Sequence, residues 1–498
     1  MYILPEPDLE FRYGQRVCDP RDGLALFGPF DADTPAHPHS IVYGVIGTRI
    51  GIDAFRAWSK RFVRPVLTDA RNYDVMNWPH FPGFEAAFDC QWPEEPAWAC
   101  ELDRDSILLS ARDLDAHKRA AQLVDLYLGG IKAASNRDEA FQLLVCVVPD
   151  KIWENCRPLS EIHDGTGFKV SAEEQARRAE GPDLFGSYDP DEYRRSVDFR
   201  RQLKARAMEH GVPLQIIKES TLNLEGGEDT GLTKDSPKSA VAWFLSNAIY
   251  YKSGGKPWRL CTAREGVCYV GFAFRRTESA VRTGARTACC AAQLFLDTGD
   301  GIVFKGELGP WYSKETRECH LNGQAARELL AGVLATYQEL GGKPLSEVFL
   351  HSRSEMSEEE YEGYRSACPS SVSLIGIRVR HDDDGIKVFR PGRNPVLRGA
   401  FVRMSETTCY LWSMGFKPRL ETYDGWDVPF PLRIDVQHGK ADLKQVAQDI
   451  LGLTKLNYNT CRLGGAQPVT VGFSNAVGEI LVTNPTVKVC RPQFKFYI

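Results

Sequence analysis

Apolar and polar positions alternate along the first part of the chain in a pattern typical of strands and helices in turn. The apolar run 39–47 ends at a glycine and predicts a buried strand, and residues 52–62 have the composition of a helix. A longer helical pattern lies within residues 107–134, and the run 141–149 predicts a second buried strand that a proline stops. Such alternation indicates a mainly parallel sheet with helices on its faces.

The pattern is interrupted at residues 157–188, which are rich in Glu, Asp, Arg and Gly and poor in large apolar groups. We expect a surface loop or partly ordered insertion there. A helix is predicted over residues 191–210, because Gly211 is a good helix-terminating residue and Pro213 lies just beyond it.

A second α/β unit begins at about residue 256. Strands are predicted at 267–274, 293–296, 303–306 and 347–351, with a helix at 322–340 before the last of them. Strand, hairpin, strand, helix and strand is the order of an RNase H-like core. We therefore expect an α/β protein with two domains, residues 1–255 and 256–498, in which a Rossmann-like unit precedes an RNase H-like one.

Composition places the chain among ordinary globular proteins. It has 498 residues, of which 43% are hydrophobic and 26% charged, enough for a sizeable core. The net charge is −5, so any basic groove must be local and offset by acidic residues elsewhere. No run of 18 apolar residues predicts a membrane span, and the first ten residues lack a signal-peptide core. The 14 scattered cysteines form no CxxC motif and are typical of free thiols in a cytoplasmic protein.

Four polar residues form a candidate phosphate site. Arg200 and Lys204 are four residues apart on the predicted helix and therefore project from one face. Gln215 follows eleven residues later, and Lys252 lies 37 residues beyond it, just before Gly254 and Gly255. Three cations and an amide could converge on a terminal phosphate, which is dianionic near neutral pH and accepts strong charge-assisted hydrogen bonds.

A plainer reading exists for these residues. Arg195, Arg201 and Arg206 crowd the same helix, so Arg200 and Lys204 could belong to a solvated basic face, and Lys252 could be a surface lysine. The combination of all four residue types is what favours a binding site.

That combination resembles the pocket of the MID domain of Argonaute proteins. The pocket of this family uses a basic or aromatic residue, a Lys four positions later, a Gln about eleven further on, and a Lys shortly before two glycines. The resemblance implies that Arg200, Lys204, Gln215 and Lys252 bind the 5′-phosphate of a guide strand. It also implies a Mg²⁺ ion between that phosphate and the terminal carboxylate of Ile498, which ends an apolar tail.

The resemblance extends over nearly the whole chain. It looks like a short prokaryotic Argonaute, a protein made of MID and PIWI domains without the N and PAZ domains. The supporting segments are Cys18–Pro29, Phe81–Phe84, Ala288–Gln293, Phe304–Tyr312 and Leu453–Asn459.

The same resemblance indicates that the nuclease site lacks metal-binding carboxylates. Residues 267–274 resemble the first strand of a PIWI domain, where active members carry a metal-binding Asp at the position of Ala273. The second Asp position is Ser354, and the last ligand position falls near Asn475. None of the three can hold Mg²⁺ as a carboxylate does, so we expect no target cleavage by this chain.

A displaced metal site is the alternative. Asp297, Asp300 or Glu307 could supply carboxylates, which would make the chain an autonomous guide-directed endonuclease. The stretch 297–301 is the better candidate for a hairpin turn, because its two glycines and its aspartates are favoured there.

The resemblance implies a subunit of a prokaryotic defence complex. Such a protein would bind a small 5′-phosphorylated guide RNA, recognise complementary single-stranded DNA, and activate a partner that carries an APAZ region, with higher oligomers forming on activation. The partner's effector would most often be a TIR domain that hydrolyses NAD⁺, with nuclease and sirtuin-like effectors as alternatives. A third reading, a scaffold that has lost guide binding, disagrees with the presence of all four pocket residues.

Overall fold

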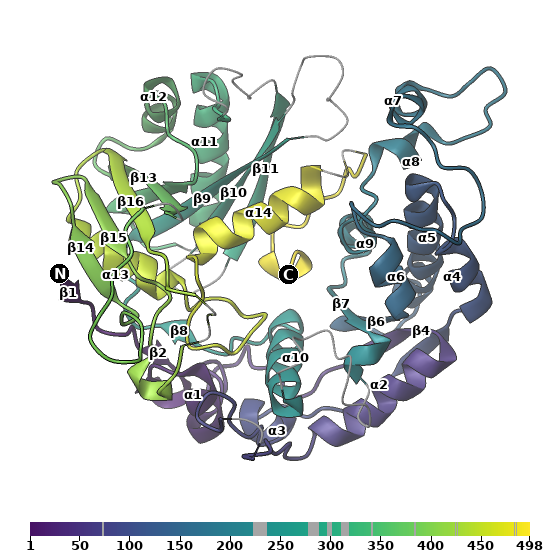
Figure 1. Ribbon diagram of the computed structural model, residues 1–498, viewed down its shortest axis with the longest axis horizontal. Coiled ribbons are helices and arrows are strands. Elements are labelled where there is room, and N and C mark those ends of the chain that lie inside the picture. The colour runs from purple at the N-terminus through teal and green to yellow at the C-terminus, as the bar shows by residue number, and fades with distance from the viewer. Residues whose placement is uncertain are drawn as a thin grey trace.

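The computed structural model describes most of the chain. The described residues are 1–71, 74–222, 237–276, 288–295, 301–309, 318–339, 342–382, 385–423, 425, 427–482, 484 and 486–498. They form a four-stranded sheet, a nine-stranded sheet and a small three-stranded sheet, with helices packed against the two larger ones (Figure 1).

The first unit is built on a four-stranded parallel sheet. Its strands in spatial order are β5 (Trp98–Glu101), β4 (Tyr43–Gly47), β6 (Leu143–Val148) and β7 (Leu214–Lys218). Every residue of β4 and β6 is buried, because helices cover both faces. Alternate residues of β6 belong to two different hydrophobic clusters, one on each side of the sheet. The predicted parallel sheet with helices on its faces is confirmed.

Helices α2 (Arg49–Phe62) and α5 (Ala116–Ser135) pack on this sheet. The longer helix expected within residues 107–134 is confirmed by α5, and a separate short helix, α4 (Arg104–Ser110), precedes it. The break arises because the Asp115 side chain accepts hydrogen bonds from the backbone N–H groups of His117 and Lys118 and so starts a new helix.

The helix expected at 191–210 is likewise divided. Its parts are α8 (Pro190–Arg194) and α9 (Phe199–Ala207), with a 3-10 turn from Met208 to His210. Asp198 caps α9 by accepting a hydrogen bond from the backbone N–H of Arg201. Gly211 ends the segment in the left-handed conformation with φ 72°, as predicted.

The charged segment 157–188 contains one helix that its composition did not predict. Helix α7 (Ala172–Glu180) is capped by Ser171, and none of its residues is buried. Its arginines Arg177 and Arg178 both pair with Glu174, one turn earlier, which supports a helix on the surface.

The second unit is built on the nine-stranded sheet. Its strands in spatial order are β1 (Tyr2–Ile3), β14 (Ala400–Arg403), β15 (Thr408–Leu411), β16 (Leu432–His438), β13 (Ser373–His381), β12 (Glu347–Ser352), β9 (Val267–Arg276), β10 (Ala288–Phe295) and β11 (Gly301–Gly309). The predicted order of strand, hairpin, strand, helix and strand is confirmed by β9, β10, β11, α11 (Gly323–Glu339) and β12. The first strand of the chain, β1, lies in this sheet.

Helices cover both faces of this sheet. Helices α11 and α12 (Glu358–Ala367) pack on one face, and α13 (Leu443–Leu453) packs on the other. Helix α14 (Val469–Val482) contacts β9, β10 and β12, and it also contacts α9 of the first unit. The two units are therefore joined through α14, which crosses the centre of Figure 1.

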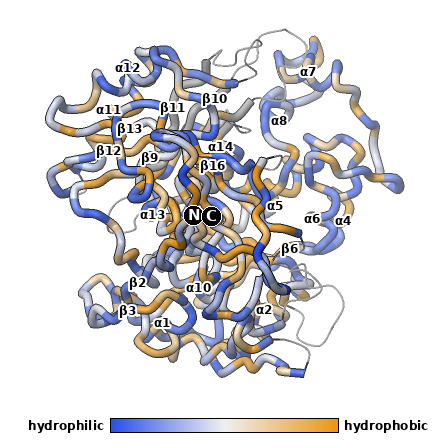
Figure 2. Tube along the Cα trace, turned by 60° about the vertical axis from the view of Figure 1, so that its left-hand side comes forward, coloured by the Kyte–Doolittle hydropathy of each residue, from blue (hydrophilic) through white to orange (hydrophobic). Residues whose placement is uncertain are grey.

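The remaining elements lie between or below the two larger sheets. They are β2 (Leu9–Glu10), β3 (Arg16–Val17), β8 (Arg259–Leu260), α1 (Pro20–Phe27), α3 (Phe84–Phe88), α6 (Asp150–Asn155) and α10 (Lys238–Lys252). Figure 2 shows hydrophilic positions along the outer helices α4 and α6.

Among the described residues, no helix has the length and hydropathy needed to cross a membrane. The twelve cysteines whose side chains are described are free thiols.

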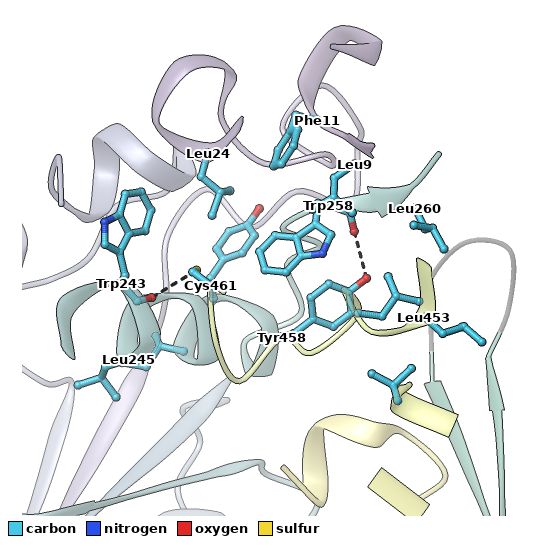
Figure 3. Close-up of a cluster of buried hydrophobic side chains, with 14 of the residues drawn as sticks. Leu9, Phe11, Leu24, Trp243, Leu245, Trp258, Leu260, Leu453, Tyr458 and Cys461 are labelled. Atoms are coloured by element: carbon cyan, nitrogen blue, oxygen red, sulfur yellow. Dashed lines mark hydrogen bonds between the residues drawn. The ribbon is translucent and has the colours of Figure 1, made fainter. Parts of the chain in front are cut away.

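A loop of the second unit is fixed onto α10. Tyr458 donates a 3.0 Å hydrogen bond to the Trp258 carbonyl, and the Cys461 thiol lies 3.6 Å from the Trp243 carbonyl (Figure 3). Asn247 of α10 donates to the carbonyl of Tyr458 at 2.7 Å. These contacts, all among buried side chains, fix the position of the loop relative to the helix.

The end of the chain is buried between the two units. Phe494, Phe496, Tyr497 and Ile498 pack with α9 and α14 in one hydrophobic cluster. Figure 1 places the C-terminus near the middle of the molecule, close to α10. This packing places Ile498 beside α9.

Candidate phosphate-binding pocket

The five residues predicted for the phosphate site lie together. Arg200, Lys204, Gln215, Lys252 and Ile498 all line one cavity of about 290 Å³. They come from positions up to 298 residues apart in the sequence, so the fold alone brings them into one place.

Three elements position these side chains. Arg200 and Lys204 project from one face of α9, as their spacing predicts. Gln215 is on β7, which begins shortly after that helix, and Lys252 is the last residue of α10. Ile498 arrives from the second unit through the buried tail.

Two pairs of contacts organise the pocket. The Lys204 ammonium donates to the carbonyl of Tyr497, at 3.2 Å, and to the terminal oxygen of Ile498. The Lys252 ammonium donates to Gln215 Oε1 at 2.7 Å and to the Leu214 carbonyl at 3.1 Å. Both ammonium groups are buried, at 3% and 2% exposure, and each is held by neutral or terminal oxygens.

Burial opposes the charged forms of the three basic side chains that line this pocket. Desolvation, followed by the charge of Arg200, lowers the pKa of Lys252 from 10.5 to about 7. Burial and the charges of Arg200 and Lys252 lower the pKa of Lys204 well below its usual range. Burial also lowers the pKa of the Arg200 guanidinium. Three crowded cations with depressed pKa values make a site that an anion would relieve.

Arg200 differs from the neighbouring arginines of α9 and of the segment before it. Arg201 pairs with Glu479 at 2.6 Å, and Arg206 pairs with Asp125 at 2.6 Å. Arg195 lies 3.6 Å from Asp191 and also donates to Thr486. Within the described part of the chain, Arg200 makes no hydrogen bond or ion pair, and it faces the cavity instead. Its guanidinium is therefore available to a ligand.

Other residues complete the cavity and were not predicted. Trp153, Phe244 and Leu245 give it an apolar wall, and Thr221 and Asn459 add polar groups. The sequence gives no periodic or charge signal for them. Of these residues, only Asn459 lies in a segment that supports the family resemblance, Leu453–Asn459. Nothing in that segment indicates contact with residues 200–252.

The three positions at which the resemblance expects metal ligands lie on or next to neighbouring elements. Ala273 is on β9 and pairs with Ala291 of β10, and Ser354 follows β12, which is parallel to β9. The backbone N–H of Ser354 donates to Ser352 Oγ at 3.1 Å. Asn475 is on α14, which packs against both β9 and β12. The topology thus brings these three sequence positions to one region of the sheet.

The alternative carboxylates are not placed by the structure. Asp297 and Asp300 lie outside the described residues, and the side chain of Glu307 on β11 is likewise outside the described part. Among the described side chains, no three His, Cys, Asp or Glu residues are arranged to hold a metal ion.

Solved structures with the same fold are Argonaute proteins. The chain matches Clostridium butyricum Argonaute bound to a guide DNA and a 19-mer target DNA over its whole length, with TM-score 0.63 and 14% identity. It also matches Aquifex aeolicus Argonaute with TM-score 0.57 and 12% identity, and the same protein with externally bound siRNA with TM-score 0.55. The α/β fold is therefore that of a substantial part of an Argonaute protein.

The match covers only part of those proteins. The chain spans 54% of the Clostridium butyricum structure and 55% and 56% of the two Aquifex aeolicus structures, about half of their length. No protein-family model and no curated protein matches the sequence.

Proposed function

We propose that this chain is the guide-binding subunit of a prokaryotic defence complex, a short Argonaute that binds a guide strand by its 5′-phosphate and does not cut the target. The single observation that carries the proposal is the convergence of Arg200, Lys204, Gln215 and Lys252 on one cavity. A terminal phosphate supplies two negative charges and several acceptor oxygens, and it matches a site with three basic groups, one of which is the unpaired guanidinium of Arg200.

Each residue has a definable role in this proposal. Arg200 donates to the phosphate through its free guanidinium, and the two lysines turn toward the phosphate oxygens while keeping part of their present contacts. Gln215 orients Lys252, because its Oε1 accepts a 2.7 Å hydrogen bond from the Lys252 ammonium. The apolar wall that includes Trp153 and Phe244 would lie beside the first nucleoside.

Magnesium is proposed as an accessory ion at this site. The pocket oxygens suited to Mg²⁺ are the terminal oxygen of Ile498 and the amide oxygen of Gln215, and phosphate would supply further ligands. Both residues line the cavity, and each oxygen accepts a hydrogen bond from a lysine ammonium that would have to turn toward the phosphate when the ion binds. Its contribution would be to neutralise charge between the phosphate and the Ile498 carboxylate.

The absence of cleavage is proposed from the residues at the PIWI positions. Asp in active members is replaced by Ala273 and Ser354, and Asn475 stands at the final ligand position. An amide and a hydroxyl are poor substitutes for the carboxylates that a two-metal site needs.

Target recognition would be by base pairing. We propose a small RNA guide and a single-stranded DNA target, with the protein contacting the duplex through its backbone. The chain spans about half the length of the Argonaute structures it matches. We propose an APAZ-containing partner with a TIR effector that hydrolyses NAD⁺, activated through higher oligomers. Nuclease or sirtuin-like effectors are the alternatives.

The nucleic acid that the chain carries from cells tests the proposal. Purified wild-type protein is expected to contain short RNA that a 5′-phosphate-dependent ligase or exonuclease recognises. The double variant Lys204→Ala, Lys252→Ala is expected to lose it. The control variant Lys132→Ala, Lys440→Ala removes two exposed charges elsewhere and is expected to retain the RNA. Equal RNA in wild type and the pocket variant would contradict the pocket assignment.

A further inference from the structure

The turn that follows Lys252 is closed over the ring of Tyr250. The backbone N–H of Gly255 donates to the Tyr250 carbonyl at 3.0 Å, and Gly254 has φ 108°, a conformation that favours glycine. A Cβ atom on Gly255 would lie 2.3 Å from the Tyr250 ring, so a glycine is needed for this close approach. Tyr250 and Lys252 are two residues apart on α10 and therefore point to opposite sides of the helix, with Lys252 toward the pocket.

A carboxylate from the segment after α1 holds this turn. Asp31 Oδ1 accepts a 2.5 Å hydrogen bond from the Tyr250 hydroxyl. Asp31 Oδ2 accepts a 2.8 Å hydrogen bond from the backbone N–H of Lys256. One carboxylate thus contacts α10 two residues before Lys252 and the turn four residues after it.

A histidine extends this contact into a buried row of three side chains, the Asp31 cluster, which consists of Asp31, Tyr250 and His37. His37 Nδ1 lies 3.0 Å from the Tyr250 hydroxyl oxygen, and His37 Nε2 lies 2.8 Å from the Asp89 carbonyl. Because a carbonyl only accepts hydrogen bonds, Nε2 carries a proton. The state of Nδ1 then follows from the other contacts of the row.

These contacts need one proton more than a neutral imidazole, a phenol and a carboxylate carry together. The contact from Nδ1 to the phenol oxygen and the contact from that oxygen to Asp31 Oδ1 each require a proton, and the Tyr250 hydroxyl supplies one. The second proton is either on His37, as an imidazolium near an Asp31 carboxylate, or on Asp31, with a neutral imidazole. In both arrangements the cluster has no net charge, which burial favours.

The surroundings of the cluster are consistent with this proton count. Burial raises the pKa values of Asp31 and Tyr250, which favours their protonated forms. The neighbouring titratable residues are Asp89, Cys90, His39 and Lys256. Burial raises the pKa of the thiol to about 12, so it is neutral, and the neighbouring carboxylate pairs with Arg12 at 2.8 Å. The neighbouring imidazole meets the His37 ring edge-on, with centroids 5.1 Å apart, and the lysine contacts the cluster through its backbone.

We infer that Asp31 is a positioning residue for the phosphate pocket: it shares one buried proton with Tyr250 and His37 and so fixes the turn that follows Lys252. The inference rests on the proposed function, because the turn sets the position of Lys252 against a guide 5′-phosphate. Loss of the proton leaves a buried negative charge and one contact without a hydrogen. The support on this side of α10 therefore weakens as the pH rises.

Tyr250→Phe tests the support, because it keeps the ring on which the turn packs and removes the hydroxyl between Asp31 and His37. The measured quantity is the ratio of affinities for one guide sequence with a 5′-phosphate and with a 5′-hydroxyl. Tyr250→Phe should lower this ratio about five-fold, which corresponds to the loss of one hydrogen bond. The matched control Tyr127→Phe removes another buried hydroxyl, which donates to the Val147 carbonyl at 2.8 Å, and should leave the ratio unchanged.

Two substitutions of Asp31 test the proton. The amide of Asp31→Asn can donate from Nδ2 to the Tyr250 oxygen and accept at Oδ1 from the Lys256 N–H, so it supplies the hydrogen that the shared proton supplies in wild type. Asp31→Asn should therefore keep the wild-type ratio of affinities, whereas Asp31→Ala should lower it as Tyr250→Phe does.

The pH dependence of stability distinguishes wild type from Asp31→Asn. Unfolded Asp and His have pKa values of about 3.9 and 6.5, so above pH 7 the folded wild type holds a proton that the unfolded chain has lost. Folded wild type should therefore lose stability as the pH rises. From pH 7 to pH 9 its unfolding constant should rise, relative to that of Asp31→Asn, by up to about ten-fold per pH unit. The contribution of Lys252 cancels, because both proteins carry it.

Each part of the inference has its own contradicting result. An unchanged ratio of affinities in Tyr250→Phe, or an equal fall in Tyr127→Phe, would overturn the positioning role of Asp31. A ratio that falls in Asp31→Asn as far as in Asp31→Ala, or a stability difference that does not change with pH, would overturn the shared proton. A ratio near one in wild type would contradict the proposed function itself, and the role of Asp31 in phosphate binding would fail with it.

Discussion

Lys252 on α10 donates a 2.7 Å hydrogen bond to Gln215 Oε1 on β7, although 37 residues separate them in the sequence. The bond joins the last residue of a helix to the second residue of a strand. It holds one of the pocket's three basic side chains at the edge of a cavity that the chain's last residue also lines. Because no carboxylate is the partner, the charge is oriented but not neutralised, which is the arrangement an anion-binding site needs.

Replacing Gln215 by Glu should stabilise the unliganded protein and weaken its binding of a 5′-phosphorylated guide. A carboxylate there would pair with Lys252 and offset the crowding of Arg200 and Lys204, so the unliganded protein should melt at a higher temperature. The same carboxylate would repel a phosphate dianion, and affinity for a 5′-phosphorylated guide should fall at least about ten-fold. Thermal melting and binding titrations measure the two effects. A variant that gains stability and binds as well as wild type would contradict a phosphate site.

The stability of the unliganded protein should depend on pH through Lys252. Its folded-state pKa is about 7 and its ordinary value is 10.5, so between these values the unfolded chain binds more protons than the folded one. The free energy of unfolding therefore rises with pH across this window, by up to a few kcal/mol. Urea denaturation at several pH values, for wild type and Lys252→Met, isolates the effect. A difference between the two proteins that does not change from pH 7 to pH 10 would refute it.

The contacts between α10 and the loop that contains Tyr458 should contribute measurably to the free energy of unfolding. Asn247→Ala removes the donor to the Tyr458 and Thr460 carbonyls, and it should lower the free energy of unfolding by about 1–3 kcal/mol. Ser246→Ala is a matched control, since the buried Ser246 hydroxyl has no hydrogen-bond partner among the described residues and its removal should cost almost nothing. Chemical denaturation compares them. Equal effects would mean that the loop is not fixed by Asn247.

No cut is expected in a DNA target paired with a loaded guide. The assay uses a 5′-phosphorylated guide, complementary DNA, and Mg²⁺ or Mn²⁺ in turn, because both ions support two-metal nucleases. Guide-dependent cleavage within the duplex would contradict the expectation. Loss of that cleavage in Asp297→Asn, Asp300→Asn or Glu307→Gln would then identify the displaced metal site.

Local signals in the sequence predicted much of the pocket. Arg200 and Lys204 lie on one helical face because their spacing matches a helical turn, and Gly211 ends the segment as its conformational freedom suggests. The segment's interruption before Asp198 was not predicted. Hydrophobic periodicity continues across such a break, whereas the break depends on one side chain capping a backbone amide.

Other features depend on contacts between distant segments and carry no local signal. Trp153, Thr221 and Asn459 reach the pocket only because α6, the end of β7 and the loop on α10 meet there. Ile498 was predicted through a family resemblance, and its position follows from the packing of the tail against α9 and α14.

The most direct measurement of the central claim is the ratio of affinities for one guide sequence with a 5′-phosphate and with a 5′-hydroxyl. For wild type the phosphorylated guide should bind about 100-fold more tightly, since two or more charge-assisted hydrogen bonds distinguish the ligands. Lys204→Ala with Lys252→Ala should reduce the ratio to a few-fold, and Lys132→Ala with Lys440→Ala should leave it unchanged. A wild-type ratio near one would contradict the account.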